Sequence, residues 1–201
     1  MAQMSPTLQR LVDEIAKLPG LGKKSAMRLA LHILKQPESE ARALAEAIIQ
    51  VKLRLHMCTR CGNLTEVDLC VVCADPKRDG SVLCVVESPQ EILRFEKATG
   101  FRGIYHVLGG VLSPLDGVGP EDLRMAELWK RTSSETFREV ILALSPTADG
   151  DATSLYLLRE LKQRNLPASR LARGVPIGAE LEHVDEVTLA RALAERTRVD
   201  G

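Results

Sequence analysis

The amino-acid sequence predicts an α/β protein with separate small modules: a helical hairpin, a four-cysteine metal clip, a parallel α/β domain and a C-terminal helical tail. Two observations support this fold class. Apolar residues recur at helical spacing through residues 6–55, whereas from residue 81 onward short β-branched runs alternate with helical segments. Between these regions stand two Cys-x-x-Cys pairs, formed by Cys58, Cys61, Cys70 and Cys73.

The N-terminal region is predicted to be helical throughout. Its apolar stripes indicate three helices, over residues 6–18, from about residue 23, and over residues 38–55. Pro6 suits the first turn of the first helix, and Ser5 suits its cap. Pro19, Gly20 and Gly22 then stop this helix and allow a tight turn.

That turn has the chemistry of a phosphate-binding site. Gly20 and Gly22 expose backbone N–H groups at the start of the second helix, where the helix dipole favours an anion. Lys23, Lys24 and Arg28 add positive charge beside them. The run L-P-G-L-G-K-K-S-A resembles the helix-hairpin-helix motif, which grips nucleic-acid phosphates without reading bases. The alternative is an ordinary helical hairpin whose lysines are only solvated.

The four cysteines have the spacing of a structural zinc site. Tetrahedral Zn²⁺ is held by four thiolates, and each Cys-x-x-Cys places two of them on one turn. Disulfides or redox use are the alternatives. Disulfides need an oxidising compartment, and a thioredoxin-like site needs one such pair rather than two. Four protein ligands leave no open position, so the site is expected to join two parts of the chain. The fifth cysteine, Cys84, is expected to be a buried thiol.

The C-terminal half is predicted to be a small parallel sheet covered by helices. Predicted strands cover residues 82–86, 104–108, 140–144 and 170–175, and predicted helices cover residues 90–98, 121–129 and 152–165. Glu87 ends the first strand, and Asp149 and Asp151 follow the third. Because ligands gather at the carboxyl ends of parallel strands, these three acids are expected to converge and could hold Mg²⁺. Helix capping is the alternative role, above all for Asp151.

A glutamate ending one strand and an Asp-x-Asp after a later strand resemble the Toprim domain of topoisomerases and primases. The whole order of modules resembles the RecR family of bacterial recombination mediators. The resemblance covers nearly the whole chain and includes residues 18–26, the four cysteines, residues 85–87, 105–110, 112–120, 173–178 and 185–189. It implies four domains: residues 1–55, a helix-hairpin-helix DNA-binding region; 56–78, a zinc finger; 79–178, a Toprim domain; and 179–201, a helical tail exchanged between subunits.

The resemblance also implies a role and partners. RecR-like proteins are not enzymes; they act with RecO and RecF in recombinational repair and promote RecA loading on gapped or single-stranded DNA. They form clamp-like homotetrameric rings and bind single- and double-stranded DNA without sequence specificity. Lys24 and Arg28 fall at the family's DNA-contacting positions, with Lys23 beside them, and the four cysteines match its zinc ligands. Glu87, Asp149 and Asp151 match an acidic set associated with partner contact. This sequence departs from the family pattern at Ala148 and Asp149, where Val and Glu are expected.

Charge and hydropathy limit the remaining function classes. Residues 1–60 carry ten Lys or Arg against five Asp or Glu, whereas residues 61–201 carry 17 against 22. This split favours two kinds of partner, DNA at the basic end and proteins at the acidic end. With no apolar signal core in residues 1–10 and no membrane-length apolar run, a cytoplasmic location is expected. The competing functions are a Mg²⁺-dependent Toprim nuclease or primase-like enzyme, and a passive DNA-binding adaptor.

Overall fold

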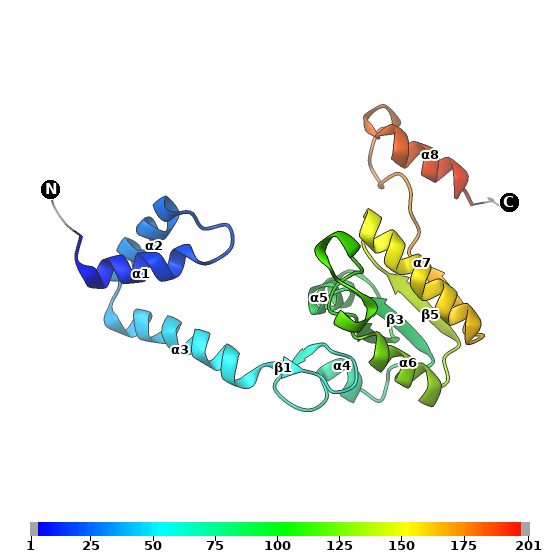
Figure 1. Ribbon diagram of the computed structural model, residues 1–201, viewed down its shortest axis with the longest axis horizontal. Helices are drawn as coiled ribbons and strands as arrows, with labels where there is room; N and C mark the ends of the chain where they lie inside the picture. The colour runs from blue at the N-terminus through cyan, green and yellow to red at the C-terminus, as the bar shows by residue number, and fades with distance from the viewer. Residues whose placement is uncertain (1–3, 198–201) are drawn as a thin grey trace. The chain divides into compact units, whose positions relative to one another are not determined.

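The computed structural model describes residues 4–197, and the chain divides after Leu55 into two compact units (Figure 1). Residues 1–3 and 198–201, at the ends of the first and last predicted domains, lie outside the described residues. The first unit consists of three helices, α1 (Pro6–Ala16), α2 (Lys23–Lys35) and α3 (Glu38–Arg54). The second unit holds a parallel sheet with helices, so the predicted α/β fold class is confirmed.

The helical unit has a small core between α1 and α2. Val12 of α1 and Ala26 and Ala30 of α2 are buried there, with apolar neighbours such as Leu8 packed around them. The first helix ends two residues earlier than predicted, because the N–H groups of Lys17 and Leu18 turn to carbonyls three residues back. In contrast, α3 buries none of its residues within this chain.

The second unit is built on a four-stranded sheet in the order β4-β3-β5-β6, with all pairs parallel. The strands are β3 (Val82–Val86), β4 (Ile104–Val107), β5 (Glu139–Ala143) and β6 (Ala168–Arg170). The longer helices are α5 (Pro89–Ala98), α6 (Met125–Ser134) and α7 (Ala148–Gln163). All five residues of β3 are buried, as expected for a central parallel strand with a continuous apolar sequence.

Short elements complete the second unit. They are β1 (His56–Met57), β2 (Leu64–Thr65), α4 (Val71–Ala74), the 3₁₀ turns η1 (Pro114–Asp116), η2 (Pro120–Asp122) and η3 (Leu181–His183), and the tail helix α8 (Glu186–Ala194). No helix within residues 4–197 is both long enough and apolar enough to cross a membrane.

Three elements of the second unit have bounds that differ from the predicted ones. The last strand covers Ala168–Arg170 rather than residues 170–175, because the chain pairs with β5 as a short polar edge strand and then leaves the sheet. The helix predicted over residues 121–129 begins at Met125 and extends to Ser134, since the Asp122 carboxylate accepts the Gly119 N–H and closes a 3₁₀ turn first. The helix predicted from residue 152 begins at Ala148.

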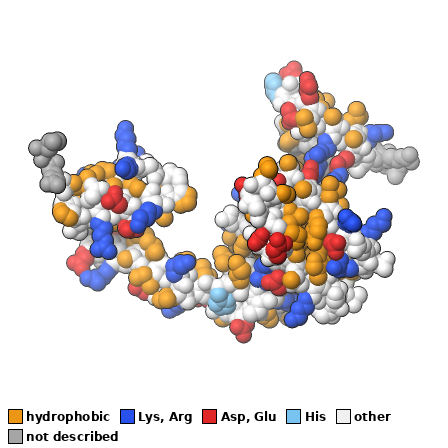
Figure 2. All heavy atoms as spheres, in the orientation of Figure 1, with side chains coloured by type: hydrophobic (Ala, Val, Ile, Leu, Met, Phe, Trp, Pro, Cys, Tyr) orange, Lys and Arg blue, Asp and Glu red, His pale blue; other side chains and the backbone are white. Residues whose placement is uncertain are grey.

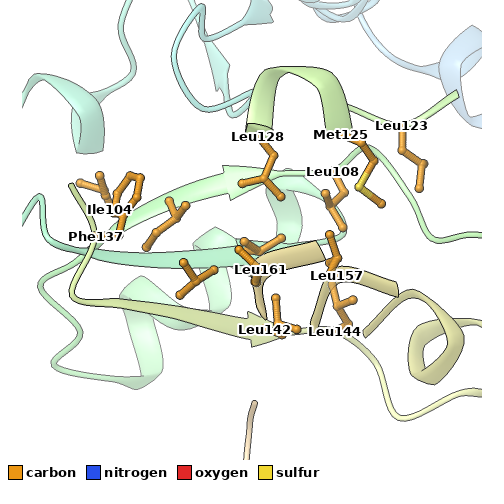
Figure 3. Close-up of a cluster of buried hydrophobic side chains, with 13 residues drawn as sticks. Ile104, Leu108, Leu123, Met125, Leu128, Phe137, Leu142, Leu144, Leu157 and Leu161 are labelled. Carbon is orange, nitrogen blue, oxygen red and sulfur yellow. The ribbon is translucent and has the colours of Figure 1, made fainter. Parts of the chain in front are cut away.

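Apolar side chains cover both faces of the sheet. On one face, α6 and α7 pack on the strands (Figure 3), and their contacts include Leu128, Leu157 and Leu161. On the other face, Ile92 of α5 joins Val86 of β3, and the buried cysteines of the four-cysteine segment belong to the same cluster. The metal-binding segment and the sheet therefore share one hydrophobic core.

Candidate functional site

The four predicted zinc ligands lie together. Cys58, Cys61, Cys70 and Cys73 are buried, and their sulfur atoms all lie within 4.8 Å of one another. The Sγ atoms of Cys61 and Cys70 are 3.5 Å apart. Zn–S bonds of about 2.3 Å in a tetrahedron separate sulfurs by about 3.8 Å, so this cluster fits Zn²⁺. All five cysteines are free thiols, as zinc ligation requires and a disulfide would not allow.

Backbone N–H groups point at two of these sulfurs and favour their thiolate form. The N–H of Asn63 donates to Cys61 Sγ at 3.4 Å, and the N–H of Cys70 donates to Cys58 Sγ at 3.3 Å. Hydrogen bonds from the thiols of Cys61 and Cys73 lower the pKa of Cys70, which favours the thiolate. Four protein ligands and full burial leave no position for substrate or water, so the chemistry is structural. By contrast, burial raises the pKa of Cys84 to about 12 and keeps that thiol inert.

Two polar contacts anchor the cysteine segment to the α/β domain. The Val107 N–H on β4 donates to the Cys61 carbonyl at 2.7 Å. Arg60, between the first two cysteines, donates from Nη2 to Glu135 at 2.9 Å, and Arg131 Nε reaches the same carboxylate at 3.2 Å. Burial works against ionisation of Glu135, but these guanidinium groups outweigh it and lower its pKa. Sequence reasoning missed this network, because single Arg and Glu residues far apart carry no recognisable signal.

The predicted phosphate grip has the expected backbone geometry. Gly20 has a φ of +78°, and Gly22 precedes α2 as an N-cap that has no side chain to satisfy the helix N–H groups. Lys23, Lys24 and Arg28 are exposed, and none forms an ion pair with any residue the structure describes. Figure 2 shows basic side chains (blue) beside hydrophobic ones (orange) on the surface of this unit. The arrangement can attract and hold an anion.

The three predicted Toprim acids follow β3 and β5, but their carboxylate oxygens do not all come within 4.8 Å of one another. Glu87 follows β3, and its carboxylate accepts the N–H of Ser145. Asp149 and Asp151 lie in the first turn of α7, not in a loop before it. Within residues 4–197, the His, Cys, Asp and Glu groups whose ligand atoms come within 4.8 Å are the cysteines and an exposed Glu180, Glu182 and His183 set; the Toprim acids form no such group.

Arginine side chains occupy one of these three acids. Asp151 makes ion pairs with Arg173 and Arg191, and the hydrogen bond from Arg173 holds the pKa of Asp151 below its usual range. A carboxylate neutralised by two guanidinium groups is a poor cation ligand. The geometry therefore gives no support to the expected Mg²⁺ site.

These features define a class: a Toprim-domain protein that carries a helix-hairpin-helix unit and a four-cysteine zinc finger. Family models match in the same order. Residues 8–52 match the RecR helix-hairpin-helix, 55–75 the RecR four-cysteine zinc finger domain, 81–172 the Toprim domain and 174–197 the RecR C-terminal region.

Relatives agree over nearly the whole chain. The sequence is 50% identical to the recombination protein RecR of Acidothermus cellulolyticus over 96% of this chain and 97% of that protein. It is 52% identical to the RecR of Chlorobium chlorochromatii over 97% of this chain and 98% of that protein. It is 48% identical to the RecR of Streptomyces avermitilis over 96% of this chain and 97% of that protein. The chain therefore belongs to the RecR family, and the predicted family resemblance and structural zinc are confirmed.

Proposed function

We propose that this protein is a non-enzymatic, DNA-binding recombination mediator, which acts in recombinational repair with RecO and RecF to promote RecA loading on gapped or single-stranded DNA. In this proposal residues 1–55 bind DNA, 56–78 hold zinc, 79–178 form the Toprim domain and 179–201 form the exchanged tail. The observation that carries it is the basic, uncapped start of α2 in a member of the RecR family.

DNA contact at this hairpin is supported by its chemistry. The N–H groups at the start of α2 have no side-chain cap, and a phosphate oxygen would satisfy them. Lys24 and Arg28 lie one turn apart on the same helix, with Lys23 beside them, so they can reach neighbouring phosphates. None of these groups reads base edges, which predicts binding to single- and double-stranded DNA alike.

A tetrameric ring is supported by apolar surface that one chain leaves uncovered. Large apolar residues of α3 are exposed, and Ile48 is 60% exposed. The tail helix α8 also buries no residue, and Val187 and Leu193 on it are exposed. Helices of this kind gain their stability by packing, so both call for a second copy of the chain. A ring would also multiply weak phosphate contacts around one DNA.

The acidic set would serve protein contact. Glu87 and Asp149 are half-buried rather than sealed in the core, and neither carboxylate pairs with a basic side chain of residues 4–197, so both stay accessible to a partner, whereas Asp151 is already paired with Arg173 and Arg191. Binding of RecO and RecF to the purified protein, with and without Asp149→Asn, tests this part. If the protein instead nicked DNA robustly in the presence of Mg²⁺, and Asp149→Ala abolished that nicking, the alternative function of a Toprim nuclease would be established.

The decisive experiment measures DNA affinity against salt for Lys24→Glu and Arg28→Glu. Each lost phosphate contact should reduce the slope of log K against log salt by about one per binding site. Lys35→Glu is the matched control, because it makes the same charge change at the other, exposed end of α2. Unchanged affinity and slope in the first two variants would contradict the proposal. Light scattering that finds only a monomer would remove the ring.

A further inference from the structure

The Asp151 carboxylate lies between two arginines, one in the segment that follows β6 and one on the tail helix α8. Oδ1 pairs with Arg173, in the segment that follows β6, and Oδ2 lies 3.1 Å from Nη2 of Arg191 on α8. The Arg173 side chain is only 11% exposed. Arg170 and Glu195 form a further ion pair between the end of the sheet and the end of α8.

Charge, rather than apolar packing, holds this tail in place. No residue of α8 is buried, so the helix contributes little hydrophobic stabilisation. A cavity of about 350 Å³ lies beside the contact, and it is lined by Pro146 after β5, Arg173 after β6 and Thr188 of α8, among others. The start of α7 favours an ionised Asp151, because the helix dipole stabilises a carboxylate in the first turn.

We propose that Asp151, Arg173 and Arg191 form a latch that closes the tail over one acid of the Toprim set. The two guanidinium groups take the place that a basic side chain of a protein partner would take. Tail closure and partner contact at Asp151 therefore exclude each other, and the partner must displace Arg191 to gain the carboxylate. The same residues would close the latch if the tail were exchanged between copies.

The neighbouring acid shows that the latch is specific to one carboxylate. Asp149 lies two residues earlier in the same helical turn, and its side chain makes no ion pair or hydrogen bond within residues 4–197. Glu87 is engaged only by a backbone N–H. The closed tail thus occupies Asp151 and leaves Glu87 and Asp149 without an arginine partner. It would therefore weaken partner binding at the acidic set rather than abolish it.

Amide hydrogen exchange in the full-length protein tests the latch without any partner. Asp151→Asn, Arg173→Ala and Arg191→Ala should each raise exchange in residues 186–194, by about five- to thirtyfold. Asp149→Asn is the matched control and should change nothing there. The double variant Asp151→Asn/Arg191→Ala should exchange no faster than the faster single variant. Equal exchange in Asp151→Asn and the unsubstituted protein would overturn the latch.

The exclusion between tail and partner rests on the proposed function, so its test uses RecO as the probe. Arg191→Ala should bind RecO about fivefold more tightly, whereas Asp151→Asn, which loses latch and carboxylate together, should not. Unchanged affinity in Arg191→Ala would overturn the exclusion. Absence of RecO binding by the unsubstituted protein would overturn the proposed partnership and the exclusion with it, while the exchange experiment would still decide the latch.

Discussion

The backbone N–H of Val107 donates a hydrogen bond of 2.7 Å to the carbonyl oxygen of Cys61. Val107 ends β4, which is an edge strand, and edge strands expose unpaired backbone groups. The cysteine segment covers part of that edge, and its buried sulfurs pack with Tyr105 and Val86 of the sheet. The zinc finger therefore contributes to the stability of the whole α/β unit.

Zinc removal should consequently unfold more than the finger. Cys58→Ser, or a strong chelator, is expected to cost more than about 4 kcal/mol of unfolding free energy. Fluorescence of Trp129, which packs against the core on the opposite face of the sheet, should report the loss in one transition with far-UV circular dichroism. Cys84→Ala is the control, because it removes a buried thiol that is not one of the metal ligands.

Two outcomes would contradict this view of the finger. A chelator that leaves the Trp129 transition unchanged would show that the finger folds independently. A Cys58→Ser variant with normal thermal stability and oligomeric mass, but without DNA binding, would point to a direct role in nucleic-acid contact.

Removing the central carboxylate of the Arg60–Glu135–Arg131 network should cost more stability than removing its exposed arginine. Arg131 is 5% exposed and also donates to the Tyr105 carbonyl, so Glu135→Ala leaves a buried charge without its carboxylate. Glu135→Ala should lower the free energy of unfolding by about 3 kcal/mol. Arg60 is 37% exposed, and Arg60→Ala should cost about 1 kcal/mol or less. Urea unfolding of both variants measures the difference, and equal costs would show that Arg131 is satisfied without Glu135.

How much of this could be predicted from the sequence depends on the range of the signal. The β3 strand and the cysteine pairs are local patterns, and both were found correctly. Arg60 and Glu135 are 75 residues apart, and nothing in either neighbourhood marks them as partners. The β6 strand was misplaced because Ala168–Arg170 is a short, polar edge strand without the apolar run that identifies a buried one.

The acidic set shows the same limit. Topology alone predicts that Glu87 and Asp149 approach one edge of the sheet, because they follow adjacent parallel strands. Topology gives no information on the tail, which places Arg191 against Asp151 across 40 residues. Charge pairing of this kind is decided by tertiary structure, so a convergent metal site was expected where a carboxylate in fact faces arginine.

Gly150 is required for the position of both aspartates. Its backbone comes so close to the Ser145 carbonyl that a Cβ would overlap that oxygen, and its N–H bonds to the Thr147 hydroxyl at 3.1 Å. Gly150→Ala should therefore displace the start of α7 and cost about 2 kcal/mol or more. Thermal unfolding measures this cost. Gly22→Ala is the control, since a Cβ there meets nothing within 4 Å.

His106 is fully buried on β4. Its Nε2 lies 2.9 Å from the Arg124 carbonyl, and its Nδ1 has no partner among the described residues. Burial lowers the pKa of His106 from 6.5 to about 4, because the charged ring is poorly solvated there. The nearby guanidinium groups of Arg131 and Arg124 act in the same direction.

The sign of the pH effect follows from this shift. The unfolded chain takes up a proton near pH 6.5, whereas the folded chain resists until about pH 4. Stability is therefore complete above pH 6.5 and falls as the pH drops toward 4, by about 3 kcal/mol at about 1.4 kcal/mol per pKa unit. His106→Gln should remove this part of the pH dependence, and His183→Gln, at an exposed site, should keep it. Unfolding free energies measured between about pH 7 and pH 4 would refute the prediction if the His106→Gln and unsubstituted curves ran parallel.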